Sequence, residues 1–513
     1  MAGYLDGKRI PDTSYEQIVR TAVVTGAAVH ARPNSRYITA GSGATTVHLP
    51  DRPRHGQMVS VVCEKGGGWQ VLLEEEKKVW YKGSEVDLNG RSPGRSADLV
   101  YLADEDRWVV VSLDALATSR GIYGVRIDTE NQNPESAVEY TDDAAGFVPM
   151  RGNDGNFDWG SWQLPFEQLG IRPCTFRNGE VNYYLNPDDY NQTADGEDAD
   201  ITTGADGDVM IEFPKIYWKF SKIGDHRCVR MSQYPHEGFV CLAHTRGDVE
   251  RDCIHFAAFH GWVDGNEKLR SLSGVIPTRS QTKDKFREYA HNNGSSGYEQ
   301  MLFYQMLLLQ VLYVIFFKSL DSQDALGRGV VDSGSVVATG SRNTDGMFYG
   351  VSTVGSNQMT KFCGIEEPWG TVRTWIDGLW STEGTTPPRR LWIATDDFDT
   401  VPYYDDNGTW KDLDPRPDNY KEYGTGFNSN VDGYPKDIHG TNETGFVTAA
   451  TGGSETTHYC DYATLRAGCV GHYGGSYGHA GDAGAFTLYL TNAPAIVLAN
   501  IGGRLTHIDK DDK

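Results

Sequence analysis

Residues 471–504 read GHYGGSYGHAGDAGAFTLYLTNAPAIVLANIGGR, a stretch without Lys, Glu, Gln, Met or Trp but rich in Gly, Tyr, His and Thr. Within it, FTLYLT (486–491) alternates apolar and polar residues, and successive side chains of a strand point to opposite faces. The pattern predicts a strand whose inner face carries Phe486, Leu488 and Leu490. Its outer face is then expected to present Thr487, Tyr489 and Thr491. The sequence thus predicts a fixed hydrophobic frame with outward-facing neighbours.

The apolar run AIVLA (495–499) follows this strand and precedes Asn500. If exposed, it would form an apolar patch suited to contact with another molecule. If buried, it would be one more strand. We expect exposure. The Tyr, Ser, His and Gly residues of the preceding stretch also resemble the composition of antibody contact loops.

Composition bounds the possible functions. The chain has 513 residues, too many for one compact core, and this length predicts about two to four domains. A hydrophobic fraction of 39% with 59 Gly and 12 Trp indicates a folded, loop-rich protein. The formal net charge of −23 argues against a nucleic-acid partner, because phosphate binding requires a cationic face.

One long apolar segment, MLFYQMLLLQVLYVIFF (301–317), lies between polar turns. It is at the short limit for a membrane span and is interrupted by Gln305 and Gln310, so we expect a buried helix and no membrane insertion. The amino terminus shows no basic region followed by an apolar one, so no secretory signal is predicted.

The cysteines form no CxxC pair, so neither a zinc ribbon nor a redox motif is predicted. We expect most of them to be buried apolar residues, in a protein assembled in a reducing cytoplasm. The eight cysteines are Cys63, Cys174, Cys228, Cys241, Cys253, Cys363, Cys460 and Cys469.

Catalytic and metal signatures are missing, since no G-x-S-x-G, HExxH, Walker or Rossmann motif occurs. The acidic stretch 186–208 lacks the ordered spacing of a calcium loop, so we expect a solvated loop. The carboxylate pair Glu366 and Glu367 and the acidic run at 396–399 are expected to be exposed in so negative a chain. We therefore predict no catalytic residue, no metal site and no cofactor.

Residues 36–113 alternate short strands with turns and predict a small all-β module. MVSVVCEKGGGWQVLLEEE (58–76) and DLVYLADEDRWVVVSL (98–113) each read as a hairpin. The arrangement resembles modules of bacteriophage tail-fibre and tail-tip proteins, which trimerise or attach to the virion. The resemblance implies a docking segment at 1–35 before the module.

FCGIEEPWGTVRTWIDGLW (362–380) and the terminal stretch form two blocks. Together they resemble the C-type-lectin-like fold shared by formylglycine-generating-type domains and retroelement-diversified phage receptor-binding proteins of the tropism-determinant class. The resemblance covers about residues 121–513. The first block retains Gly364, Ile365, Glu366, Trp369, Gly370, Trp375, Asp377 and Gly378. The second retains Gly474, Gly475, Ala483, Gly484, Phe486, Leu488, Leu490, Asn492, Pro494, Asn500, Ile501, Gly502 and Arg504.

This resemblance implies a multidomain chain with an α+β lectin-like display domain at 151–513. A connector and first strand at 114–150 would precede it, and 471–504 would be its variable region. The implied scaffold is Trp369, Gly370, Trp375, Asp377, Gly475, Gly484, Phe486 and Arg504. The implied ligand-contacting variable positions are His472, Tyr473, Ser476, Tyr477, His479, Asp482, Thr487, Tyr489, Thr491, Ala495, Ile496, Val497, Leu498 and Ala499.

In this family, changes occur at adenines of a template repeat, typically in Asn codons. Such changes cannot produce the five residue types that 471–504 lacks. The expected function is that of a non-enzymatic receptor-binding protein at the virion tail tip, probing a host surface protein or glycan. Its amino terminus would bind tail or baseplate proteins, and the molecule would be a homotrimer. Two alternatives remain open: a formylglycine-generating-type oxidase or envelope-degrading enzyme, and a virion structural spacer.

Overall fold

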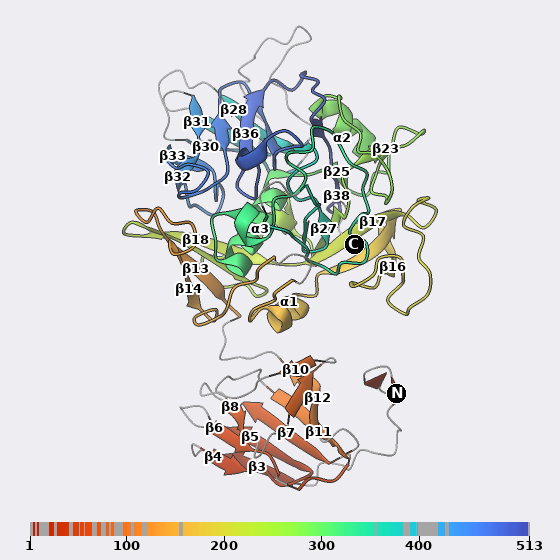
Figure 1. Ribbon diagram of the computed structural model, residues 1–513, viewed down its shortest axis with the longest axis vertical. Helices are drawn as coiled ribbons and strands as arrows, with labels where there is room; N and C mark the ends of the chain where they lie inside the picture. The colour runs from red at the N-terminus through yellow and green to blue at the C-terminus, as the bar shows by residue number, and fades with distance from the viewer. Residues whose placement is uncertain are drawn as a thin grey trace. The chain divides into compact units, whose positions relative to one another are not determined.

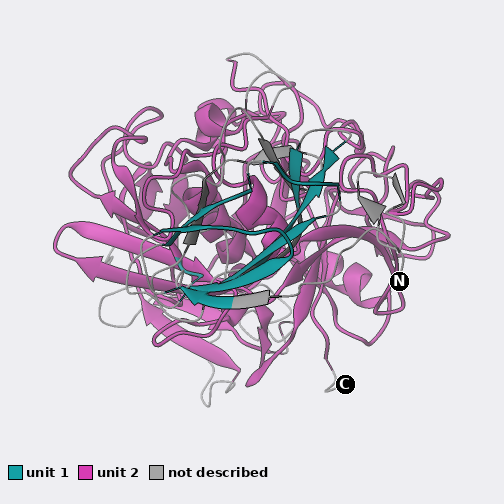
Figure 2. Cartoon of the chain, turned by 90° about the horizontal axis from the view of Figure 1, so that it is seen from below, with its two compact units in different colours: residues 1–122 teal, residues 123–513 magenta. Residues whose placement is uncertain are grey.

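The computed structural model separates the chain into two compact units, Met1–Ile122 and Tyr123–Lys513, called unit 1 and unit 2 (Figure 2). The structure describes residues 4–5, 8–9, 20–24, 28–39, 45–50, 52–55, 57–63, 69–72, 78–81, 84–86, 96–103, 107–114, 121–152, 157–353, 357–382, 390–396, 398, 419–425 and 430–510. Most regular structure in both units is β-sheet, and the α-helices of the described residues lie in unit 2 (Figure 1). The chain is therefore a multidomain protein of the all-β and α+β type.

Unit 1 contains two stacks of parallel strands that the chain visits alternately. One stack consists of β3 (Arg20–Val24), β5 (Ser35–Thr39) and β7 (Met58–Cys63). The other consists of β4 (Ala28–His30), β6 (Thr45–His48) and β8 (Trp69–Leu72). Each successive pair of strands adds one strand to each stack. The chain therefore winds between two parallel sheets in this part of unit 1.

The hairpin predicted around Gly66–Gly68 is wrong, because β7 and β8 belong to different sheets. Alternating strands and a glycine turn are compatible with either connection, and only the pairing partners decide between them. The second predicted hairpin is confirmed: β11 (Ser96–Leu102) pairs antiparallel with β12 (Arg107–Asp114). Both sheets contribute to one core, in which Val47, Val59 and Trp108 are fully buried.

Four further strands lie in the described part of unit 1. They are β1 (Tyr4–Leu5), β2 (Lys8–Arg9), β9 (Lys78–Tyr81) and β10 (Ser84–Val86). The segment 1–35, expected to be a separate docking element, supplies β3 and β4 to the β-module. Its boundary at residue 35 therefore needs correction.

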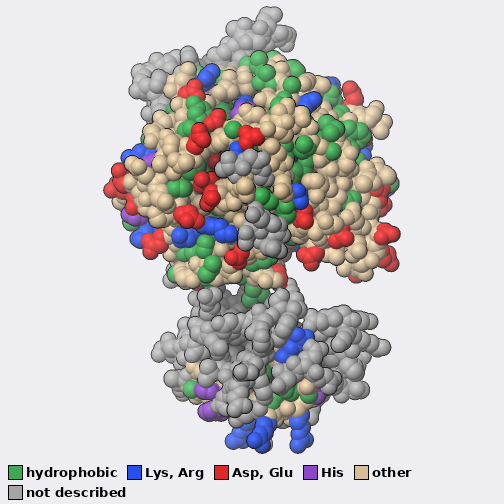
Figure 3. Space-filling view, viewed as in Figure 1, with side chains coloured by type: hydrophobic (Ala, Val, Ile, Leu, Met, Phe, Trp, Pro, Cys, Tyr) green, Lys and Arg blue, Asp and Glu red, His purple; other side chains and the backbone are tan. Residues whose placement is uncertain are grey.

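Charge differs between the visible faces of the two units (Figure 3). Lys and Arg side chains gather at one end of unit 1 in this view. Arg32, Arg36, Arg52 and Arg54 are exposed residues of unit 1. Acidic side chains are scattered over unit 2. The net negative charge of the whole chain therefore does not predict the charge of the described surface of unit 1.

Unit 2 begins with β13 (Tyr123–Asp128) and β14 (Val138–Asp142), which pair with each other. Strand β13 also pairs with β19 (His226–Ser232), and β19 pairs with β18 (Tyr217–Ile223). The segment 114–150, expected to contain a connector and a first strand, contributes two strands, β13 and β14, to a four-stranded sheet. The change of unit falls at Tyr123 and not at residue 151.

A six-stranded antiparallel sheet runs through the middle of unit 2, in the order β16-β15-β17-β22-β38-β25. The C-terminal strand β38 (Leu505–His507) lies between β22 (Cys253–Ala257) and β25 (Tyr298–Gln300). The other members are β15 (Arg172–Arg177), β16 (Glu180–Tyr184) and β17 (Asp208–Pro214).

The largest sheet of unit 2 contains strands from both blocks of sequence quoted above, in the order β30-β29-β28-β35-β36-β34-β31, with β37 also paired to β28. Its members are β28 (Arg373–Thr382), β29 (Arg390–Ala394), β30 (Tyr420–Gly424), β31 (Val431–Gly433), β34 (Ala463–Leu465), β35 (Val470–Tyr473), β36 (Leu488–Asn492) and β37 (Ile501–Gly502).

Helix α3 (Phe303–Phe317) lies at the centre of unit 2, between this sheet and the sheet of β13 and β18 (Figure 1). All of its residues are buried, as the sequence predicted. Its two glutamines have partners: Gln310 Nε2 donates to the carbonyl of Ala485, and Gln305 Oε1 accepts from the amide of Leu302. Over the described residues, no helix has the length and apolar character needed to cross a membrane.

Three further helices are short: α1 (Gln163–Leu169), α2 (Lys283–His291) and α4 (Ser322–Ala325). Asp321 directly precedes helix α4, and its side chain accepts from the amide of Asp324 and caps the first turn. Ser322, the first residue of α4, is buried, and its hydroxyl accepts from the amide of Ala485. Helix α4 thus ties α3 to the terminal block.

Candidate binding surface

The two blocks of sequence lie side by side in the largest sheet. Strand β28 of the first block pairs antiparallel with β35 and parallel with β37. Strands of the terminal block therefore lie on both sides of the first residues of β28. Arg504 reinforces this contact, because its guanidinium donates to the carbonyls of Glu366 and Glu367 at 3.0 and 2.9 Å. A third bond, to the carbonyl of Ala257, joins the six-stranded sheet.

All eight predicted scaffold residues are buried: Trp369, Gly370, Trp375, Asp377, Gly475, Gly484, Phe486 and Arg504. Two glycines show why the frame needs them. A Cβ at Gly484 would stand 2.0 Å from Asp461 Oδ1, and a Cβ at Gly475 would stand 2.4 Å from Ala483 Cβ. No side chain fits at either position without displacing its neighbours.

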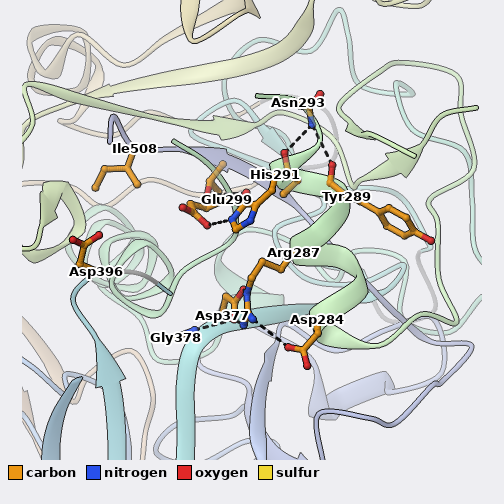
Figure 4. Close-up of polar contacts among 12 residues, drawn as sticks. Asp284, Arg287, Tyr289, His291, Asn293, Glu299, Asp377, Gly378, Asp396 and Ile508 are labelled. Atoms are coloured by element: carbon orange, nitrogen blue, oxygen red, sulfur yellow. Dashed lines mark hydrogen bonds and ion pairs between the residues drawn. The ribbon is translucent and has the colours of Figure 1, made fainter. Parts of the chain in front are cut away.

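A buried ion cluster below the surface fixes β28 to helix α2 (Figure 4). Asp377 is fully buried and receives Arg287 Nε at 2.5 Å and Lys283 Nζ at 3.0 Å. Burial raises the pKa of Asp377, but the two cations more than offset this and lower the pKa to about 2. Asp284 lies at the exposed edge of the cluster, within reach of the same two cations.

Strand β36 does not present its second face to solvent as predicted. Phe486, Leu488 and Leu490 are buried, but so are Thr487 and Tyr489, the latter with 5% of its surface exposed. The Tyr489 ring stacks on His472 and Tyr462. A period of two identifies the two faces of a strand but cannot show that both are covered.

Three more predicted contact residues are buried, namely His472, Tyr473 and Ser476. Burial, with Arg373 as a second cause, lowers the pKa of His472 well below its ordinary value, so the ring is neutral. Its Nε2 lies 2.8 Å from Asn492 Nδ2. These residues support the surface from below and cannot touch a ligand without rearrangement.

Nine predicted positions do reach solvent, and we call them the contact surface: Tyr477, His479, Asp482, Thr491, Ala495, Ile496, Val497, Leu498 and Ala499. The first four are half-buried and the last five are exposed. The expected exposure of 495–499 is therefore confirmed, with Ile496 38%, Val497 52% and Leu498 36% exposed. Ile276, 53% exposed, belongs to a neighbouring loop whose Ser280 amide donates to the carbonyl of Leu498.

Arg373 was not predicted from the sequence, yet it joins the two parts of the contact surface. Its amide donates to the carbonyl of Asn500, and two residues earlier the carbonyl of Thr371 accepts from the amide of Tyr477. Its guanidinium lies 4.3 Å above the centre of the Tyr489 ring. Arg373 forms no ion pair within 4 Å with another described residue, although the charge of Asp482 in the contact surface acts on it from a longer distance.

His479 illustrates how this cation affects its neighbours. Burial first, and then Arg373, lower the pKa of His479 to about 4, so its imidazole is neutral at pH 7. Its Nδ1 lies 2.7 Å from the hydroxyl of Ser476 and accepts from the amide of the same residue at 3.2 Å. The ring is therefore held in one orientation at the edge of the surface.

Glu366 and Glu367 were expected to be exposed, and this is wrong, since both are buried. Glu366 accepts from the amides of Gly340 and Arg342. Burial raises the pKa of Glu367 to about 8, although the amides of Thr360 and Val330 donate to it. Both carboxylates act as internal acceptors that connect loops beneath the surface.

The two cysteines relevant to an oxidase are buried. Burial, followed by the nearby Asp321 and Asp461, raises the pKa of Cys460, which keeps the thiol protonated. Cys469 Sγ donates to the carbonyl of Ala467.

No model of a protein family matches the chain, and a search of curated proteins gives no match either.

Proposed function

We propose that unit 2 is a C-type-lectin-like display domain whose contact surface binds a ligand on the bacterial cell surface. In this proposal the chain is a bacteriophage tail receptor-binding protein. The observation that carries the proposal is the exposed apolar loop 495–499 on a rigid, fully buried frame. The two blocks of sequence described above add the resemblance to diversified phage receptor-binding proteins.

The apolar loop is unusual for this molecule. Among the described residues nine large hydrophobic side chains are exposed, and three of them, Ile496, Val497 and Leu498, are consecutive. Isolated exposed hydrophobics are ordinary, but contiguous ones mark sites of contact with other molecules. Burying them in a complex would supply the hydrophobic contribution to binding.

Arg373 indicates the chemistry of the ligand. The backbone amide of Arg373 bonds to Asn500, directly after the apolar loop, and its guanidinium lies over Tyr489. This cation and the apolar loop favour a ligand that combines an acidic group with an apolar part. The neutral His479 and half-buried Tyr477 add hydrogen-bonding groups around it. We therefore expect an acidic or amphipathic surface component and not a neutral, strongly hydrated glycan.

Retroelement diversification, if it acts on this chain, fits the nine positions of the contact surface. It does not fit His472, Tyr473, Ser476, Thr487 and Tyr489, because changes at buried positions alter the packing of the frame. We propose that tolerated variation is confined to the exposed and half-buried set. A near-copy of the last part of the gene, differing at adenines and adjacent to a reverse transcriptase gene, would support this origin.

Unit 1 is proposed to attach the protein to the tail. Its exposed arginines at 32, 36, 52 and 54 suit an acidic surface on a tail or baseplate protein. A homotrimer remains part of the proposal, since multivalency strengthens weak single-site binding.

The test uses the labelled full-length protein and a panel of intact bacterial cells from diverse species, with binding measured by flow cytometry. We expect the wild-type protein to label at least one strain. The triple variant Ile496→Ser, Val497→Ser, Leu498→Ser should lose at least about tenfold of the signal on that strain, because a hot-spot loop dominates affinity.

The matched control is Val148→Ser, Ile223→Ser, Val249→Ser, three exposed hydrophobics in other parts of unit 2. It should keep wild-type labelling. Equal labelling by wild type and the loop variant would refute the site, and absence of labelling on every strain would favour a structural spacer. Replacing Tyr473 or Tyr489 would not test the surface, because both are buried.

A further inference from the structure

A second feature of unit 2, outside the contact surface, is a cluster of three side chains on adjacent strands of the six-stranded sheet. We call it the Glu-Cys-His cluster: Glu212 on β17, and Cys253 and His255 on β22. Glu212 pairs directly with His255 across the two strands, and Cys253 lies two residues before His255 on the same face. One ligand atom from each residue lies within 4.8 Å of the other two.

His255 is the most unusual member. The residue is 5% exposed, and neither ring nitrogen has a hydrogen-bond partner within the described part of the chain. Nε2 stands 3.5 Å from Glu212 Oε2, which is too long for a good hydrogen bond. Phe176 packs on the ring, with 4.2 Å between ring centres. A buried imidazole with both nitrogens unsatisfied is costly unless another group binds it.

Glu212 is already oriented by two other side chains. Arg172 Nη2 donates to Glu212 Oε1 at 2.7 Å, and the Tyr184 hydroxyl lies 3.1 and 3.2 Å from the two carboxylate oxygens. Burial raises the pKa of Glu212, but its contacts with His255 and Arg172 more than offset this and lower the pKa to about 2. The carboxylate is therefore charged at neutral pH, with Oε2 turned towards His255.

Cys253 completes the cluster from the side that solvent can reach, since its side chain is half-buried. Burial first, and the negative charges of Glu212, Asp509 and Asp252 next, raise the pKa of its thiol to about 11. Arg172 lowers the pKa of Cys253 in part, and Lys215 pairs with Asp252 at 3.3 Å. The acidic neighbours still disfavour a free thiolate in the absence of a bound cation.

We propose that Glu212 Oε2, Cys253 Sγ and one ring nitrogen of His255 bind a zinc ion. The mixed oxygen, sulfur and nitrogen donors match zinc, and a separation of 3.5 Å between two ligand atoms is that expected when both bind one tetrahedral ion. Water from the solvent side of Cys253 would take the fourth position. Arg172 and Tyr184 hold the carboxylate in the ligand orientation.

Binding is accompanied by one ionisation. The Cys253 S–H bond breaks, the sulfur–zinc bond forms, and the proton is released to solvent. Zinc affinity should therefore increase with pH across the neutral range. The ion would join β17 to β22 and stabilise unit 2, because a ligand that binds the folded form alone raises its stability.

The experiment uses the purified full-length protein, stripped of metal by chelation, and titrates it with Co²⁺ as a spectroscopic substitute for zinc. We expect a thiolate-to-cobalt charge-transfer band that saturates at one ion per chain. Adding Zn²⁺ should abolish the band and raise the unfolding temperature of the protein.

Cys253→Ser and His255→Gln should each weaken Co²⁺ binding by at least about 100-fold and remove or shift the band. Cys228→Ser, at a buried cysteine outside the cluster, is the matched control and should keep wild-type titration. Near-ultraviolet circular dichroism of each variant confirms that it is folded. Absence of the band, a band equally lost in Cys228→Ser, or one kept in folded Cys253→Ser would overturn the proposal.

Discussion

Replacing Asp377 by Asn tests the frame beneath the contact surface. Asp377 is fully buried and is the only described carboxylate that contacts both Arg287 and Lys283 from inside the core (Figure 4). An asparagine has nearly the same size but no charge. The change therefore leaves two buried cations without their internal counter-ion, and both were desolvated on folding.

Two effects set the total loss of unfolding free energy and the part of it that depends on pH. Removing one partner of a buried ion pair costs about 3–5 kcal/mol of unfolding free energy. The pKa of Asp377 falls from 3.8 to about 2, and this difference corresponds to about 2 kcal/mol of stability at neutral pH. A lowered folded-state pKa means that this stability is present above pH about 4 and is lost as the pH falls towards 2.

Urea unfolding followed by tryptophan fluorescence measures the effect, with the transition of unit 2 analysed separately from that of unit 1. We expect Asp377→Asn to lose about 3–5 kcal/mol at pH 7. At pH 3 the gap to wild type should shrink by about 1 kcal/mol, because wild-type Asp377 has then lost part of its contribution.

Asp284→Asn is the matched control, because Asp284 contacts the same two cations but its side chain is 58% exposed. Surface ion pairs contribute little, so this variant should lose less than about 1 kcal/mol. Similar losses in both variants, or a gap for Asp377→Asn that does not change between pH 7 and pH 3, would refute the reasoning.

Two further predictions concern the frame and use thermal unfolding. Gly484→Ala should destabilise unit 2 by at least about 2 kcal/mol, because its Cβ would collide with Asp461. Gly478→Ala, where no atom lies within 4 Å, should stay within about 0.5 kcal/mol of wild type, and an equal loss would contradict the packing argument. Tyr489→Ala should cost about 3 kcal/mol, whereas Tyr477→Ala should cost less than about 1 kcal/mol; the reverse order would mean that Tyr489 is not part of the frame.

Sequence patterns correctly predicted burial or exposure for several segments of unit 2. The run 301–317 had too many apolar residues for any exposed helix, and α3 is buried throughout. The scaffold glycines and tryptophans were likewise found in the core. The apolar loop 495–499 was expected to be exposed, and it is exposed.

Failures arose where partners distant in sequence decide the structure. Strand β8 pairs in parallel with β6 and not with β7, and nothing in the glycine turn between β7 and β8 reveals this. Tyr489 is buried against the rings of His472 and Tyr462 and beneath the guanidinium of Arg373. Thr487 is buried with its hydroxyl donating to the carbonyl of Asp482. Arg373 and the Glu-Cys-His cluster were missed for the same reason, since Glu212 and His255 meet only through strand pairing.

Strand β38 lies in the interior of the six-stranded sheet although it follows the proposed variable region in the chain. A ribosome must therefore translate residues 471–504 before β22 and β25 can acquire their shared neighbour. Any frameshift or premature stop introduced there deletes this strand and leaves two unpaired edges inside the domain. The arrangement makes correct translation of residues 471–504 a condition for completing the six-stranded sheet.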